Sequence, residues 1–176
     1  VAEKGVIWAA LRSTGRSGHG SMPHPENADN AAARLAEAVV ALARSRRPAR
    51  VIPVVRDFFA ALGLQAVTAA VDRADEPAAA AALEDAISDP MLRRSLAAML
   101  RDTITPTVMH AGKKVNVIPG VGAAELDIRT LPGTDQDAVL AEIEALVGEL
   151  ASVESLLPLP PVEWPASSTG APMASS

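Results

Sequence analysis

The pattern of apolar residues divides this chain into two similar units with a long helical stretch between them. Each unit combines strand-like and helix-like sequence. Residues 123–130 alternate between apolar and charged side chains, which is typical of a strand buried on one face. A similar alternation covers residues 6–13, and residues 105–111 predict a third strand with an early proline, as an edge strand tolerates. Residues 160–164 predict a short fourth strand at an edge.

Two segments carry apolar residues at helical spacing and predict amphipathic helices over residues 27–46 and 135–150. Thr134 is the expected N-cap of the second helix, because its hydroxyl can accept a hydrogen bond from the first turn. Four half-buried strands and two such helices fit an α+β fold, a two-layer ferredoxin-like sandwich with a four-stranded antiparallel sheet. The helix-free face of this sheet is expected to carry Trp8, Arg12, Glu125, Asp127 and Arg129.

The segment of residues 48–102 has a different character, because it is rich in alanine and contains no convincing strand. We expect it to be an all-helical insertion of two to four short helices. Its helices are expected to break at Gly63, Pro77 and Pro90. The sequence therefore predicts one domain over residues 1–164 that contains this insertion. Residues 165–176, rich in Ser, Ala and Pro, are expected to be a linker or the truncated start of a second domain.

The composition excludes several classes of protein. The formal net charge is −5, and the aromatic residues are two Phe and two Trp. The chain thus lacks the basic surface and stacking rings of a nucleic-acid-binding domain. It contains no cysteine, which rules out disulfides, zinc–thiolate sites and a cysteine nucleophile. No apolar run reaches the length of a membrane span, so we expect neither nucleic acid nor a membrane as a partner.

A glycine-rich loop after the first strand contains the most distinctive candidate for chemistry, His19. Its neighbours Gly18 and Gly20 leave the imidazole exposed, and an imidazole can stabilise an oxyanion by donating a hydrogen bond. The alternative is a loop residue that only caps or packs. His24, between two prolines, and His110, on a predicted strand, are expected to be structural.

Arg129 and Asn116 are the other candidate binding residues. Arg129 ends a predicted strand, where its guanidinium could bind a carboxylate at two points or form an ion pair with Glu125 or Asp127. Asn116 is a polar residue in an apolar stretch, and it either holds a turn or presents its amide to a ligand. The chain has three histidines and neither an HEXXH nor an HXD motif, which is too few ligands for a two-metal site. We therefore expect no metal in this chain.

Four stretches of the chain, taken in their order, resemble a known family. They are residues 15–23 ahead of a helix, residues 105–107, residues 116–119 and residues 127–133. Together they are similar to the dimerisation, or lid, domain of the M20 (M20/M25/M40) family of zinc metallopeptidases and aminoacylases. The resemblance runs collinearly over residues 1–164, and it is closest to members that carry a helical insertion.

The resemblance implies a function that this chain shares with a missing catalytic domain. In that family the larger domain holds two zinc ions, which activate water to hydrolyse C–N bonds of peptides or N-acyl amino acids. The resemblance implies a homodimer through the lid, a fragment that is inactive alone, and a cytoplasmic location. It implies that His19 reaches the partner subunit's active site to stabilise an oxyanion, that Arg129 binds the substrate carboxylate, and that Asn116 lines the substrate pocket.

Two other functions are compatible with the same sequence. The first is a ferredoxin-like regulatory module that binds amino acids between paired domains, although such modules usually lack a long helical insertion. The second is a purely structural dimerisation domain. An RNA-binding ferredoxin-like domain is disfavoured, because the open sheet face lacks the aromatic pair that stacks bases.

Overall fold

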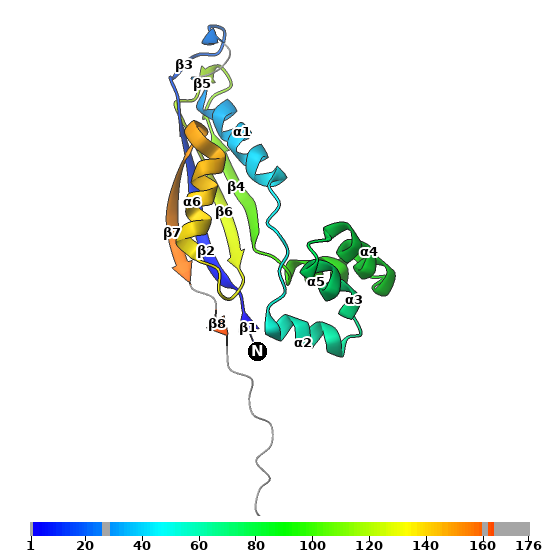
Figure 1. Cartoon of the computed structure of the whole chain (residues 1–176). Coiled ribbons are helices and arrows are strands. Elements are labelled where there is room, and N and C mark those ends of the chain that lie inside the picture. The colour runs from blue at the N-terminus through cyan, green and yellow to red at the C-terminus, as the bar shows by residue number, and fades with distance from the viewer. Residues whose placement is uncertain (1, 26–28, 160–161, 164–176) are drawn as a thin grey trace, which may run out of the picture.

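The centre of the molecule is a four-stranded antiparallel sheet (Figure 1). The computed structural model describes residues 2–25, 29–159 and 162–163. The strands are β2 (Gly5–Thr14), β4 (Thr103–Ala111), β6 (Val121–Thr130) and β7 (Ser152–Leu159). Their order across the sheet is β4-β6-β2-β7, so the first and third strands along the chain lie in the middle. This order and the two covering helices confirm the expected ferredoxin-like sandwich.

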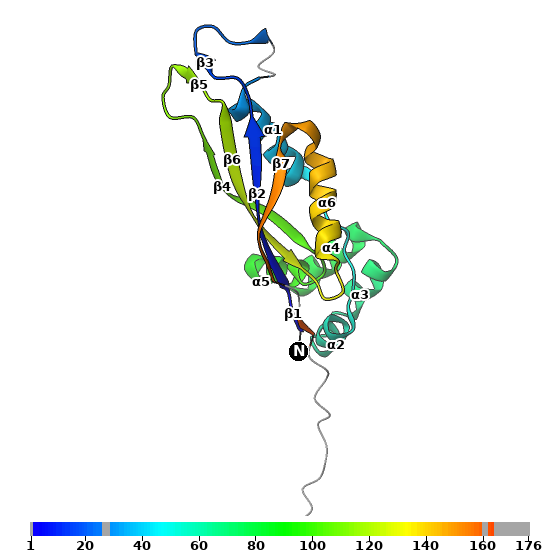
Figure 2. The same ribbon diagram turned by 90° about the vertical axis from the view of Figure 1, so that its left-hand side faces the viewer.

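Two helices, α1 (Ala31–Arg44) and α6 (Gln136–Val147), cover one face of the sheet (Figure 2). Alternate residues of each central strand point into this layer, as the period of two requires. The fully buried core residues include Ile7, Leu11, Leu35, Leu42, Leu126, Ile128 and Ile143. No helix of the described residues packs on the other face, where Trp8 is 49% exposed. Among the described residues, no helix covers that face and no strand pairs with the outer edges of β4 and β7.

The second amphipathic helix begins differently from the sequence prediction. Its N-cap is Asp135, whose carboxylate accepts hydrogen bonds from the N–H groups of Asp137 (3.0 Å) and Ala138 (3.3 Å). The prediction of Thr134 as the N-cap was wrong, because the Thr134 hydroxyl instead hydrogen-bonds to the Asp102 carboxylate at 3.0 Å. A carboxylate in the cap position also favours the positive end of the helix dipole.

The fourth strand of the sheet was predicted in the wrong place. It is β7, which ends before the expected residues 160–164. Of that stretch, β8 (Val162–Glu163) pairs with β1 (Ala2–Glu3) below the main sheet, and the other residues lie outside the described part. In the register with β2, Leu156 has no partner, because Trp8 pairs with Leu157 and Ala9 with Ser155. This bulge breaks the alternation by which the sequence would reveal a strand.

Four helices fill the segment between α1 and β4, and the described residues there contain no strand. They are α2 (Pro53–Ala61), α3 (Gln65–Asp72), α4 (Glu76–Ala86) and α5 (Pro90–Ala98). They enclose a second apolar core, in which Phe59 and Val67 are completely buried. Gly63 adopts φ +74° between α2 and α3, as its predicted role as a break requires. The division into residues 1–164 and 165–176 stays a prediction, and residues 165–176 lie outside the described part.

The helical insertion lies at the base of the sheet, the end near the N-terminus (Figure 1), and hydrogen bonds fix it there. The Arg50 N–H donates to the Leu100 carbonyl (2.7 Å), so the chain enters and leaves the insertion at one point. The Asp102 carboxylate accepts from the Leu131 N–H (2.6 Å), and the Lys4 ammonium donates to the Arg101 carbonyl (2.7 Å). These contacts join the insertion to the sheet through polar groups, and the two buried clusters of the described residues share no member.

Candidate functional site

The loop that carries His19 is held at the tip of the sheet, far from the insertion (Figure 1). It forms a two-residue strand, β3 (Gly18–His19), which pairs antiparallel with β5 (Val117–Ile118). The Gly20 N–H then donates to the Asn116 carbonyl at 2.8 Å. A Cβ on Gly20 would lie only 3.3 Å from the Asn116 backbone, so glycine permits this close approach. The sequence did not predict this ladder, which brings two candidate residues together.

Ser21 determines how the His19 imidazole is presented. The Ser21 N–H donates to Nδ1 of His19 at 3.3 Å, and the Ser21 hydroxyl lies 2.8 Å from the same nitrogen. Because a backbone N–H can only donate, Nδ1 acts as the acceptor and the neutral ring carries its proton on Nε2. Among the described residues, none forms a hydrogen bond with Nε2. The exposed ring therefore presents an N–H donor to a ligand at the tip.

Asn116 lies beside His19 at the tip and is exposed. Its carbonyl accepts from Gly20, while its side-chain amide makes no hydrogen bond to any residue in the described part of the chain. The structure thus brings His19 and Asn116 to the same end of the sheet. Of the two readings for Asn116, the backbone contact holds the turn, and the side chain stays available for a ligand.

Arg129 lies at the opposite end of the sheet. It pairs in register with Val6 on β2 and Thr103 on β4, near the base. Val121, at the tip end of the same strand, is eight residues away, a separation of roughly 27 Å at the rise of an extended strand. The Nε of Arg129 lies 3.0 and 3.2 Å from the two carboxylate oxygens of Asp127. One copy of the chain therefore does not bring Arg129 close to His19.

The charge of Arg129 also acts on Lys4 at the base. Burial is the main cause that lowers the pKa of Lys4, the Asp102 carboxylate opposes it, and the nearby Arg129 guanidinium adds to the lowering. Arg129 is partly exposed, with 42% of its side chain accessible. Its guanidinium is thus accessible to a carboxylate that replaces Asp127.

The other two histidines lie outside this arrangement. His24 is half-buried in an irregular part of the loop after His19. His110 is exposed on β4 and lines a hollow near the tip. The sequence predicted no role for Ser21, although the His-x-Ser spacing of residues 19 and 21 is short enough for a local hydrogen bond.

The described residues contain neither a metal-ligand cluster nor a helix that could span a membrane. Within residues 2–25, 29–159 and 162–163, no three side chains of His, Asp or Glu gather closely enough to hold a metal ion. In the same part of the chain, no helix has the length and apolar character needed to cross a membrane.

A family model described as "Peptidase dimerisation domain", M20_dimer, matches residues 1–154. The chain belongs to this family. The match to an M20 dimerisation domain confirms the resemblance inferred from the four ordered stretches, and it covers both β-α units of the sandwich as well as the insertion. No curated protein matches the chain.

Solved structures share this fold at low sequence identity. Human carnosine dipeptidase 1 has a TM-score of 0.59 at 13% identity, over 91% of this chain and 37% of its own. The M20 family metallo-carboxypeptidase Sso-CP2 from Sulfolobus solfataricus has a TM-score of 0.57 at 16% identity, over 95% of this chain and 46% of its own. A hydantoinase/carbamoylase family amidase from Burkholderia ambifaria has a TM-score of 0.54 at 12% identity, over 92% of this chain and 29% of its own. This M20 dimerisation domain therefore spans less than half the length of these proteins.

Proposed function

We propose that this chain is the dimerisation and lid domain of a longer binuclear zinc amidohydrolase that cleaves C–N bonds in small peptides or N-acyl amino acids. Two findings support the proposal. The chain matches the M20 dimerisation family, and its fold is similar to that of peptidases and an amidase that are more than twice as long. The two zinc ions would be bound outside this chain, because its described residues contain no metal-ligand cluster. The chain alone is then expected to be inactive.

The separation of the candidate residues along the sheet is the observation that carries the proposed role of this domain. His19 and Asn116 lie at the tip, whereas Arg129 lies at the base, roughly 27 Å away along the strand direction. A small substrate cannot contact both ends of one sheet. In a two-fold dimer, however, the tip of one protomer can approach a substrate that Arg129 of the other protomer binds. We therefore infer that each site combines residues from two chains.

The chemistry of the three side chains fits this composite site. The Nε2–H of His19 would donate a hydrogen bond to the oxyanion that develops on the scissile carbonyl, and Ser21 would keep the ring in that tautomer. Asn116 would line the same end of the substrate. Arg129 would exchange its pair with Asp127 for the carboxylate of the substrate, since a guanidinium binds carboxylates at two points.

Mixing two inactive variants of the full-length enzyme tests this arrangement. We expect His19→Ala to lower kcat by about 100-fold or more, the cost of removing one oxyanion donor. Arg129→Ala should lose activity through weaker substrate binding. When the two variants exchange subunits, each mixed dimer regains one intact site, so the mixture should recover up to about a quarter of wild-type activity.

The same experiment separates the alternatives. If His19 and Arg129 act within one chain, a mixed dimer contains no intact site and activity stays at the level of the single variants. A less than threefold loss of kcat in His19→Ala would favour a purely structural dimerisation domain. Saturable binding of free amino acids to the isolated chain, together with unchanged activity of both variants, would favour the regulatory module.

A further inference from the structure

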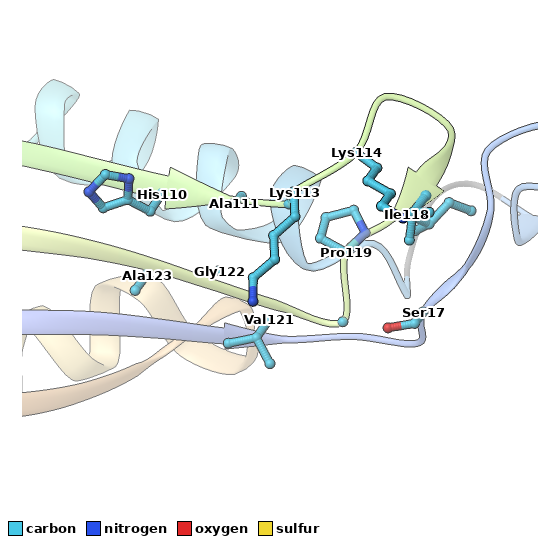
Figure 3. A pocket seen from close by; sticks show the side chains of 13 residues that line it. Ser17, His110, Ala111, Lys113, Lys114, Ile118, Pro119, Val121, Gly122 and Ala123 are labelled. Atoms are coloured by element: carbon cyan, nitrogen blue, oxygen red, sulfur yellow. The ribbon is translucent and has the colours of Figure 1, made fainter.

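A hollow of about 640 Å³ lies at the tip of the sheet, between the loop that joins β4 to β5 and the start of β6 (Figure 3). Its volume is in the range of pockets that bind small organic molecules. His110 and Ala123, which line it, stand in one cross-strand row with the exposed Arg12. The hollow therefore opens on the face of the sheet that the two helices leave uncovered.

The wall of this hollow combines an apolar surface with positive charge. Val117, Ile118, Pro119 and Val121 supply the apolar part. Lys113 and Lys114 supply two ammonium groups, and none of the described residues that line the hollow is acidic. Neither lysine forms an ion pair with any residue in the described part of the chain. In Figure 3 the Lys113 side chain extends toward the start of β6.

Two backbone features keep this wall in place without side chains. Gly112 adopts φ +75° where the chain leaves β4, which allows the loop to curl over the hollow. On the far side, the Gly15 N–H donates to the Gly120 carbonyl at 2.9 Å, which fixes the turn between β5 and β6 to the end of β2. The hollow is thus bounded by a hydrogen-bonded framework.

We propose that this hollow binds a small organic acid, with its carboxylate on Lys113 and Lys114 and its hydrocarbon part on the apolar wall. These ammonium groups, which have no ion-pair partner in the described part of the chain, attract an anion. The apolar wall favours a ligand whose charge is attached to a hydrocarbon body rather than a bare ion. The hollow shares β5 with the ladder that holds His19. If the function proposed above holds, the ligand is the acidic acyl or side-chain part of the substrate.

Binding to the chain itself tests the site independently of any catalytic role. We would titrate the ¹⁵N-labelled chain with hexanoate and follow the amides of three glycines that line the hollow, Gly112, Gly120 and Gly122. Hexanoate should shift these signals saturably in the millimolar range and leave Gly63, in the insertion, unchanged. Acetate lacks the hydrocarbon body and hexan-1-ol lacks the charge, so both should bind at least threefold more weakly.

A matched pair of charge variants assigns the binding to the lysines. Lys113→Gln with Lys114→Gln should weaken hexanoate binding about threefold or more, as expected for the loss of exposed ionic contacts. Arg44→Gln with Arg73→Gln removes the same charge from exposed positions elsewhere and should leave the affinity unchanged. Equal binding of acetate and hexanoate, equal loss in both double variants, or no saturable shift would overturn the proposal. An unchanged kcat in His19→Ala would contradict the proposed function of the domain but not this binding site, because the titration measures binding and not catalysis.

Discussion

At the scale of single residues, Gly15 shows how tightly the tip of the sheet is packed. A Cβ at this position would lie 2.1 Å from the Asp29 carbonyl oxygen, a contact that requires the backbone to move. The neighbouring Arg16 N–H donates to that same carbonyl at 2.7 Å, which holds the two segments together. The glycine is thus required by contact with another segment, and local sequence does not reveal this.

We expect Gly15→Ala to lower the free energy of unfolding by about 1–3 kcal/mol, the usual cost of overpacking. Urea denaturation followed by circular dichroism would measure the change. Gly18→Ala is the matched control, because its Cβ would meet only the Ile118 side chain at an ordinary 3.6 Å. An equal loss of unfolding free energy in both variants would show that the close contact of residue 15 with Asp29 is not the cause of the loss in Gly15→Ala.

The candidate residues could be chosen from the sequence, but their arrangement could not. His19, Asn116 and Arg129 were identified from their residue types and flanking motifs. Nothing local to those motifs indicates that His19 and Asn116 share a two-residue ladder, because so short a pairing depends on the fold that brings distant segments together. The ion pair of Arg129 with Asp127 was, in contrast, one of the two roles that the sequence predicted, since the two residues share a strand face.

At the scale of elements, the amphipathic helices were predictable and the last strand was not. The stripe of Leu35, Ala38 and Leu42 repeats at helical spacing and is buried as expected. β7 escaped prediction because a bulge at Leu156 interrupts its period. Its charged Glu154 pairs with Arg12 on the neighbouring strand at 2.6 Å, a long-range contact that the local pattern does not contain.

The start of α6 provides a test of how one residue fixes an element. Asp135→Ala should lower the free energy of unfolding by about 1 kcal/mol, because it removes the side-chain acceptor of the first-turn N–H groups. Thermal unfolding would measure the loss. Asp137→Ala, in the first turn of the same helix, removes an acidic side chain without removing the cap and should cost less. A larger effect at residue 137 would contradict the assignment of the cap.

The start of α4 makes the stability of the insertion depend on pH. The backbone N–H of Ala49 donates to the Glu76 carboxylate (3.0 Å), and this hydrogen bond is the main cause that lowers the pKa of Glu76, with the Arg101 guanidinium adding to it. The folded state then holds the proton less tightly than the unfolded state. The stabilisation is present above the ordinary pKa of a glutamate and is lost as the pH falls through the lowered value.

Glu76→Gln should therefore flatten the dependence of the unfolding free energy on pH in the acid range, while it lowers stability at neutral pH. Urea denaturation at a series of pH values would show both effects. Glu37→Gln is the control, since Glu37 is exposed on α1 and its side chain makes no hydrogen bond in the described part of the chain. An unchanged acid slope in Glu76→Gln would show that the contact with Ala49 does not bind the carboxylate in solution.

At the scale of the whole molecule, the sandwich and the insertion have separate cores. Among the described residues, the thirteen that form the buried sandwich core all lie outside the insertion, from Ile7 to Leu42 and from Ala124 to Ala151. The insertion buries its own set around Phe59. The sequence predicted the all-helical insertion correctly, because a change from strand-and-helix pattern to helix alone is visible without any contact. It did not predict that the insertion has a core of its own. The hydrogen bonds at the base, such as that of Asp102 with Leu131, were not predictable, since they join residues far apart in the chain.

Separate cores predict that the sandwich folds without the insertion. Residues 51–99 can be replaced by a short Gly-Ser turn, because the Arg50 N–H and the Leu100 carbonyl are only 2.7 Å apart. We expect the shortened chain to keep the sheet and a cooperative unfolding transition, at lower stability, because Lys4 loses the Ala98 carbonyl that it contacts at 2.8 Å. Circular dichroism and amide exchange of β2 and β6 would show whether the sheet survives.

A substitution in the intact chain tests the same independence without any deletion. Phe59 is completely buried in the insertion, and Phe59→Ala should cost that core about 3–5 kcal/mol. If the cores are independent, amide exchange should accelerate in α2 to α5 while the protection of β2 and β6 stays unchanged. An equal loss of protection in the sheet would show that the hydrogen bonds at the base of the sheet couple the sandwich and the insertion into one cooperative unit. The shortened chain would then not be expected to fold.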